Sequence, residues 1–413
     1  MAQTIFWIII AVILFDFVFE NILDYLNYRN MKEKIPQELN GIYDKERYRK
    51  SQQYEKVNSG FSLITGIFNL AVILLMLFGG GFGKMDEWVR GITINPYLQT
   101  LLFFGVLALA YDLIMLPFQI YSTFVIEERF GFNKTTPLTF VTDKLKSWLL
   151  GAIIGGGIIL FMQWAWMAAG QWFWLIAMAG ITGFMIFMAM FYTDLIVPLF
   201  NKLTPLEEGE LKTAIYDFAS RAGFKLKNVF VINGSKRSTK ANAYFSGLGP
   251  KKKIVLYDTL LHDLDNQEIV AVLAHETGHY KKKHVTKGLI MSLFQTALMV
   301  WLLGMALRFP ELSKALGSNV PSFYMGIVAF GLLFTPVSFL TGIVSHIISR
   351  KHEYQADAFA RSYHLGKQLI NALIKLSRNN LSNLTPHPLY VFFHYSHPTL
   401  LQRKKAIEQV VNN

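Results

Sequence analysis

Seven apolar stretches, each long enough to cross a lipid bilayer as a helix, restrict this chain to the folds of polytopic membrane proteins. A helix needs about 20 apolar residues to span the hydrocarbon core. Only 16% of the 413 residues are charged, against about 25% in ordinary soluble domains, and the mean hydropathy is +0.32. The stretches lie near residues 4–23, 61–83, 98–125, 147–168, 172–198, 286–308 and 322–348. We therefore predict an α-helical polytopic membrane protein with seven transmembrane helices.

The connections between these stretches differ in their content of Lys and Arg. The counts are eight in 24–60, two in 84–97, four in 126–146, none in 169–171 and one in 309–321. Basic residues accumulate on the inner side of membrane proteins. The alternation predicts an outer N-terminus, with the long 199–285 connection and the C-terminal tail on the inner, cytoplasmic side.

The net charge of +12 is explained by this topology. Two basic clusters, residues 251–253 and 281–283, are predicted to form a solvated face near anionic headgroups of the lipid bilayer, and no nucleic-acid partner is predicted. The chain has no cysteine, which excludes disulfides, thiolate metal sites and a cysteine nucleophile.

An H-E-x-x-H motif, His275-Glu276-Thr277-Gly278-His279, lies just before the sixth apolar stretch. On a helix, residues four apart share a face, so His275 and His279 can bind one Zn²⁺. Glu276 follows the first ligand and is placed to take a proton from a zinc-bound water and to deliver it to a leaving amine. We attribute Gly278 to a need to avoid crowding the metal. The alternative is a chance match on a solvated helix.

The segment that carries the motif has an α+β pattern. A predicted helix over 207–222 precedes three strand-like runs, 229–233, 242–246 and 253–257, and the motif helix follows. In zinc proteases an edge strand commonly pairs with the extended substrate, and 242–246 is our candidate for it. The alternative is that these strands only pack the domain.

A catalytic zinc site needs a third protein ligand. The helix that continues from the seventh stretch offers Glu353 and Asp357, which are four residues apart on one face. Glu353 is predicted to bind the metal and Asp357 to accept the second N–H of a ligand histidine. His352 is the competing ligand, and a solvated charged helix end is the alternative.

Taken together, these motifs resemble the type I CAAX prenyl proteases, integral-membrane zinc endoproteases of the endoplasmic reticulum (ER), the inner nuclear membrane and some bacteria. The resemblance extends over essentially the whole chain. It is carried by H-E-x-x-H, the downstream E-x-x-x-D, Ser235-Lys236-Arg237-Ser238, Asn242-Ala243-Tyr244-Phe245 and Ser396-His397-Pro398 with Arg403. This sequence departs from the family pattern at Lys240-Ala241, where many members carry His-Ser, and at Thr277, where many carry Leu.

The resemblance implies one catalytic Zn²⁺, bound by His275, His279 and Glu353, with Glu276 as general base. It further implies that Asp357 orients a ligand histidine and that His397 and Arg403 line the site, with His397 placed to stabilise an oxyanion. Substrate contacts are expected from Asn242, Ala243 and Tyr244. The implied location is an ER-type or bacterial inner membrane.

The predicted organisation has four parts. They are transmembrane helices 1–5 (1–198), an inner-side protease domain (199–285), transmembrane helices 6 and 7 (286–348) and an inner-side helical tail that completes the zinc site (349–413). The predicted function is a zinc metalloendopeptidase that cleaves near the C-terminus of prenylated, CAAX-type proteins or peptides. One alternative is a quality-control protease acting on non-prenylated, membrane-associated substrates. The other is a transporter or channel that uses acidic residues within the apolar stretches, such as Asp16 and Asp112, as an ion path; the intact Glu276 and the absence of internal repeats argue against it.

Overall fold

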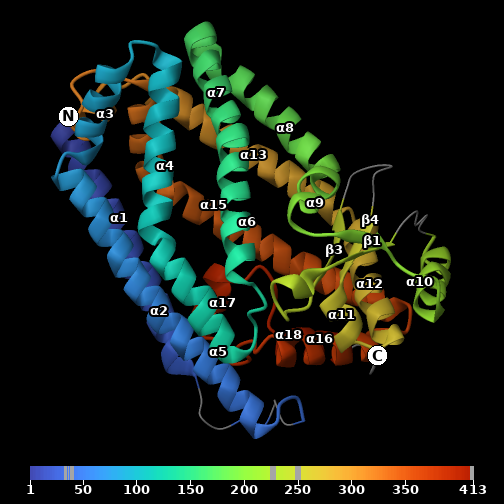
Figure 1. Ribbon diagram of the computed structural model, residues 1–413. Coiled ribbons are helices and arrows are strands. Elements are labelled where there is room, and N and C mark those ends of the chain that lie inside the picture. Colours follow the sequence, from blue (N-terminus) through green and yellow to red (C-terminus); the bar gives the residue numbers. More distant parts are fainter. Residues whose placement is uncertain (32–34, 36, 38–40, 224–228, 247–252, 410–413) are drawn as a thin grey trace.

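Long helices form most of the molecule, and a small sheet with short helices lies at one side (Figure 1). This computed structural model describes the chain except residues 32–34, 36, 38–40, 224–228, 247–252 and 410–413. Lys251 and Lys252 of the first basic cluster therefore lie outside the described residues.

Six helical segments among the described residues are long and apolar enough to cross a membrane. They are Ala2–Asn30 (α1), Lys45–Phe78 (α2), Pro96–Phe130 (α4, η2 and α5), Pro137–Phe200 (α6 to α9), His284–Ala306 (α13) and Phe323–Ser362 (α15). Few of their side chains are buried, and apolar side chains such as Phe15, Leu75 and Phe294 are exposed. Apolar residues that face outward along a whole helix are expected where lipid replaces water as the solvent.

The segment Pro137–Phe200 contains two of the seven predicted spans. Its 64 residues would measure about 96 Å as one helix, roughly three times the thickness of a hydrocarbon core. The chain turns at Gly170–Trp172, where Gly170 has a φ of 50°. Beyond this turn α8 (Phe173–Leu195) lies against α7 (Gly156–Ala169), and a Cβ at Gly180 would stand 2.2 Å from the Phe161 ring.

The sheet has four strands in the order β1-β2-β4-β3. The strands β2 (Val229–Ile232), β3 (Ala243–Ser246) and β4 (Lys253–Tyr257) confirm the three predicted runs. The strand β1 (Leu203–Pro205) was not predicted, since three residues that end in proline carry little strand signal. Parallel pairing joins β2 to β4, and antiparallel pairing joins β3 to β4, so β3 lies at an edge, as expected.

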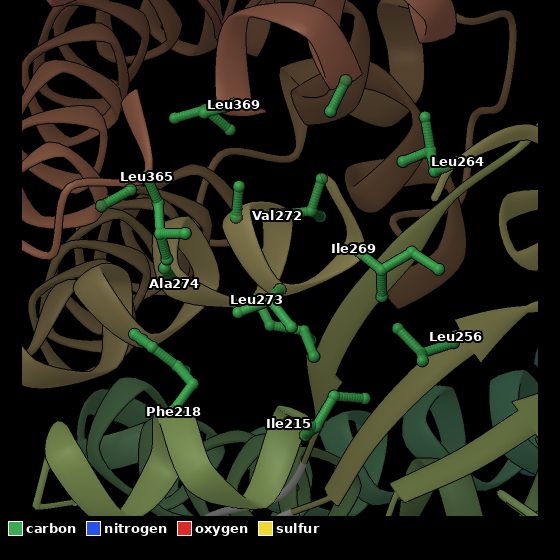
Figure 2. Close-up of a cluster of buried hydrophobic side chains, with 14 of the residues drawn as sticks. Ile215, Phe218, Leu256, Leu264, Ile269, Val272, Leu273, Ala274, Leu365 and Leu369 are labelled. Carbon is green, nitrogen blue, oxygen red and sulfur yellow. The ribbon is translucent and has the colours of Figure 1, made fainter. Parts of the chain in front are cut away.

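The motif helix α12 (Asn266–Lys281) is the centre of the largest buried cluster (Figure 2). It begins with a capping box, in which Asp265 and Glu268 bond to each other's backbone N–H groups. From Ile269 to His275 every residue is buried. Ile215 and Phe218 of α10 (Glu210–Arg221) pack on one side of it, and Leu369 of α16 (Gly366–Asn379) on another (Figure 2). A helix buried on all sides is held rigidly, which suits a ligand-bearing element.

The C-terminal part folds back onto the motif helix. α15 is one continuous helix of 40 residues, so the predicted division at 348/349 falls inside it. α16, α17 (Pro388–His394) and α18 (Leu400–Glu408) then surround its C-terminal half (Figure 1). The remaining short helices are α3 (Gly81–Ile92), α11 (Asp258–Asp263) and α14 (Glu311–Ala315).

Candidate active site

His275 and His279 project from one face of α12, one turn apart. Their ring centroids are 4.8 Å apart, and the Nε2 atoms face each other at 3.1 Å. His275 is 6% exposed, whereas His279 is partly exposed towards a cavity. The spacing predicted from the sequence is therefore realised as two convergent imidazoles.

Glu353 of α15 completes, with these histidines, a cluster of three residues that could hold a metal ion. Its Oε1 lies 3.2 Å from His279 Nε2, and its Oε2 lies 3.4 Å from His275 Nε2. One donor atom from each of the three residues lies within 4.8 Å of the others. His352, the competing candidate, stacks on His284 instead and lies outside this cluster.

The three residues fit a bound divalent metal ion. Glu353 is 4% exposed, and its Oε2 accepts no hydrogen bond within the described chain. His275 Nε2 at 3.4 Å and Arg403 Nη1 at 3.5 Å are its neighbours, and a buried carboxylate oxygen that makes no hydrogen bond is costly unless a cation lies closer to it. Burial by itself lowers the pKa of His275, but the carboxylates of Asp357 and Glu353 outweigh it and raise that pKa to about 9. The pocket thus favours positive charge where the three ligands converge.

Asp357 lies behind His275, on the side away from Glu353. Its Oδ1 accepts a hydrogen bond from His275 Nδ1 at 2.8 Å, which directs the opposite nitrogen, Nε2, towards His279 and Glu353 and makes it the atom available to a metal. Arg403 of α18 binds the same carboxylate through Nε and Nη2, at 2.9 and 2.6 Å. Asp357 is 2% exposed and Arg403 8% exposed, so this is a buried ion pair.

Glu276 faces a cavity of about 1980 Å³ at the metal cluster. Burial raises the pKa of the Glu276 carboxyl above its usual range, while His275 and His279 act in the opposite direction. A carboxyl group with a raised pKa is a better proton acceptor than an exposed glutamate. The cavity is bounded by α8, α12, α13, α15 and the edge strand β3.

His397, Asn242, Ala243 and Tyr244 all line this cavity. The Nε2 of His397 lies 3.3 Å from Glu353 Oε1, and its Nδ1 lies 2.8 Å from Ser396 Oγ. Asn242 is exposed at the start of β3, and its side chain accepts a hydrogen bond from the N–H of Ala243. Each residue predicted for the site is thus brought to the cavity or, for Asp357, directly behind it.

Two residues of the site were not predicted. His284 Nδ1 lies 3.1 Å from His279 Nδ1, and Arg350 binds backbone carbonyls just before His397. A separation of five residues, from His279 to His284, does not place side chains on one helical face. The chain turns at Lys283, whose φ is 58°, and brings His284 back. Nothing in the spacing of the sequence signals this turn.

Two family models together match most of the chain. One, described as CAAX prenyl protease N-terminal, five membrane helices, matches residues 24–202, and the other, peptidase family M48, matches residues 205–411. The two matched regions meet at β1, the first strand of the sheet.

Curated relatives and a solved structure resemble the chain along its whole length. The CAAX prenyl protease 1 of Saccharomyces cerevisiae is 38% identical over 423 residues, covering 96% of this chain and 93% of the relative. The human CAAX prenyl protease 1 homolog is 32% identical, covering 91% and 88%. The crystal structure of S. mikatae Ste24p is 37% identical with a TM-score of 0.92, covering 98% of this chain and 99% of that chain. The resemblance predicted from the motifs is confirmed, and the chain belongs to the CAAX prenyl protease 1 family of M48 peptidases.

Proposed function

We propose that this protein is an integral-membrane zinc metalloendopeptidase that cleaves near the C-terminus of prenylated, CAAX-type proteins or peptides. One observation carries the proposal. The three-ligand cluster and Glu276 lie in the wall of a cavity whose other walls are an exposed strand edge and apolar membrane helices. Such a cavity can accept a peptide and a lipid together.

The ligands of the metal are His275 Nε2, His279 Nε2 and the Glu353 carboxylate. Two imidazoles and one carboxylate are a ligand set typical of catalytic zinc. When bound, Zn²⁺ supplies Lewis acidity that polarises a carbonyl and makes water a stronger acid.

Glu276 acts as the general base and then as the proton donor. Its carboxylate takes a proton from a water molecule in the cavity and delivers it to the amine that leaves. His397 lies 3.3 Å from Glu353 and is placed to donate a hydrogen bond to the oxyanion that develops on the scissile carbonyl. Asp357 and Arg403 position His275.

The edge strand β3 holds the substrate in an extended conformation. Asn242, Ala243 and Tyr244 line the cavity on the strand that has no partner on its outer side among the described strands. An extended peptide added to this edge gains backbone hydrogen bonds that are independent of its side chains.

The lipid of the substrate lies against the membrane helices. Met188 and Ala189 of α8, Met291 of α13 and Ile348 of α15 line the cavity beyond the metal cluster. The names of the curated relatives, CAAX prenyl protease 1, support a prenylated substrate. A CAAX sequence has three residues after the prenylated cysteine, and the bond that precedes these three is the proposed cleavage site.

The topology has seven spans, with the N-terminus outside and the active site and C-terminus inside. The length of Pro137–Phe200 and the turn at Gly170 support two spans within that segment. The distribution of Lys and Arg supports the orientation in an ER-type or bacterial inner membrane. The four predicted parts, 1–198, 199–285, 286–348 and 349–413, describe this organisation, with the last boundary inside α15.

The test is cleavage of a farnesylated C-a-a-X peptide by the detergent-purified protein, with the same peptide lacking the lipid as comparison. We expect lipid-dependent cleavage that is abolished by a chelator, restored by Zn²⁺ and absent in Glu276→Gln. Equal cleavage of both peptides would favour the quality-control protease instead. Cleavage that survives in Glu276→Gln would overturn the proposed chemistry.

A further inference from the structure

We propose that His284 and Gln355 position the second metal ligand, His279, by fixing its tautomer and ring orientation. The inference rests on the metal site of the proposed function and deepens it. Asp357 does this for His275, but it does not reach His279, so the second imidazole needs a partner of its own.

The hydrogen-bonding atoms form a continuous chain. His279 Nδ1 lies 3.1 Å from His284 Nδ1, and His284 Nε2 lies 2.9 Å from Gln355 Oε1. Because His279 Nε2 faces the other ligands, its proton is on Nδ1 and is donated to His284 Nδ1. A neutral His284 then carries its own proton on Nε2 and donates it to the amide oxygen of Gln355. Each of these hydrogen bonds then has one donor and one acceptor, so the tautomers of His279 and His284 are consistent with each other.

The backbone and the packing of side chains hold this series of hydrogen bonds in place. Lys283, in a left-handed conformation, ends the link between α12 and α13 and turns the His284 ring towards His279. His284 is 5% exposed, and His352 stacks on its ring with centroids 3.9 Å apart and planes at 10°. Gln355 is on α15, two residues after Glu353. The helix α15 therefore supplies one metal ligand, Glu353, and also Gln355, the last acceptor in the series of hydrogen bonds that orients His279.

The sharpest readout is the zinc affinity of the apoprotein, measured by competition with a chromophoric chelator, because it does not depend on the substrate. His284→Leu removes the acceptor, and we expect zinc binding to weaken by about 10- to 100-fold. His284→Asn places an amide oxygen close to the position of Nδ1 and is expected to stay within about threefold of the parent protein. His262→Leu on α11, where the side chain is 90% exposed and outside the metal cluster, is the matched control and is expected to bind zinc like the parent.

Substitutions of Gln355 test the direction of donation in these hydrogen bonds. Gln355→Glu keeps an acceptor for His284 Nε2 and is expected to retain zinc, whereas Gln355→Leu is expected to lose affinity. Thermal unfolding of each variant shows whether weak zinc binding comes from a misplaced His279 in a folded protein or from loss of the fold. Unchanged affinity in His284→Leu, or folded His284→Asn as weak as folded His284→Leu, would overturn the inference. Zinc binding by Gln355→Glu that is as weak as zinc binding by Gln355→Leu would also overturn the inference.

The two proposals can fail separately. If the parent protein binds zinc but does not cleave the farnesylated peptide, the proposed substrate is wrong while the affinity series still tests the role of His284. If the parent protein binds no zinc, both proposals fail.

Discussion

Gly278 on α12 lies directly against Ala356 on α15, with no space for a side chain between the two helices. A Cβ at position 278 would stand 3.0 Å from Ala356 Cα and 2.9 Å from Phe359 Cβ. The glycine thus allows the close approach that brings Glu353 to the two histidines. This contact between helices is a second reason for a glycine at position 278, besides the predicted need to avoid crowding the metal.

Gly278→Ala is therefore expected to push α15 away and to disturb the metal cluster. Overpacking a close contact costs about 1–3 kcal/mol in the free energy of unfolding. Thermal unfolding and zinc affinity should both fall. The control is Gly342→Ala on α15, where no atom lies within 4 Å of the added Cβ. If Gly278→Ala behaves like this control, the contact does not set the distance between the helices.

Asp357→Asn is expected to weaken zinc binding by about 10- to 100-fold, because the orientation of His275 depends on that carboxylate. It also removes the closer ion-pair partner of the buried Arg403, which keeps only the contact with Glu353 Oε2 at 3.5 Å, at a cost of about 3–5 kcal/mol in stability.

A double variant separates these two effects. Asp357→Asn with Arg403→Met should regain part of the stability, because the buried charge that lost its closer partner is gone, but not the zinc affinity. Recovery of zinc affinity in the double variant would mean that Arg403, and not the orientation of His275, caused the loss.

Arg350 is expected to position His397 from a distance. Its Nη1 donates to the carbonyl oxygens of Tyr395 at 2.6 Å and of Val391 and Phe392 at 3.2 Å, which holds the end of α17 two residues before His397. Arg350→Met should lower kcat by about 10- to 100-fold, the cost of misplacing a catalytic group by about 1 Å, and leave zinc content unchanged.

A double-mutant cycle tests this role. Arg350→Met should add little to the loss already caused by His397→Ala, because both changes affect the same group. Additive losses in kcat would show that Arg350 acts elsewhere.

Lys240 is expected to position the substrate strand. Its Nζ lies 2.9 Å from Tyr54 Oη, 3.0 Å from Glu127 Oε2 and 4.4 Å from the centroid of the Phe132 ring. These contacts tie the residue two positions before Asn242 to the membrane helices. Lys240→Met should raise KM for the peptide by about tenfold, equivalent to about 1.4 kcal/mol, with a smaller change in kcat.

The control for this prediction is Lys212→Met. Lys212 pairs with the exposed Glu208 on the surface, and solvent screens such a pair, so its loss is expected to leave the site unchanged. A KM for Lys240→Met equal to that of this control would contradict the positioning role.

Local periodicity accounts for what the sequence determined by itself. Apolar runs of about 20 residues predicted the membrane helices, and the four-residue spacing of His275 with His279 and of Glu353 with Asp357 predicted two shared helix faces. Three of the four strands followed from short runs of β-branched and aromatic residues.

Contacts between distant residues were decided only by the tertiary structure. His275 and Asp357 are 82 residues apart, and their motifs suggested a pairing, but the ring nitrogen used and the ion pair with Arg403 depend on how α12, α15 and α18 pack. The position of His284 depends on the left-handed conformation of Lys283, and that of Arg350 on bonds to backbone carbonyls. Neither feature leaves a pattern of side chains in the sequence. Periodicity describes one element at a time, whereas these positions are set by the packing of several elements around one metal site.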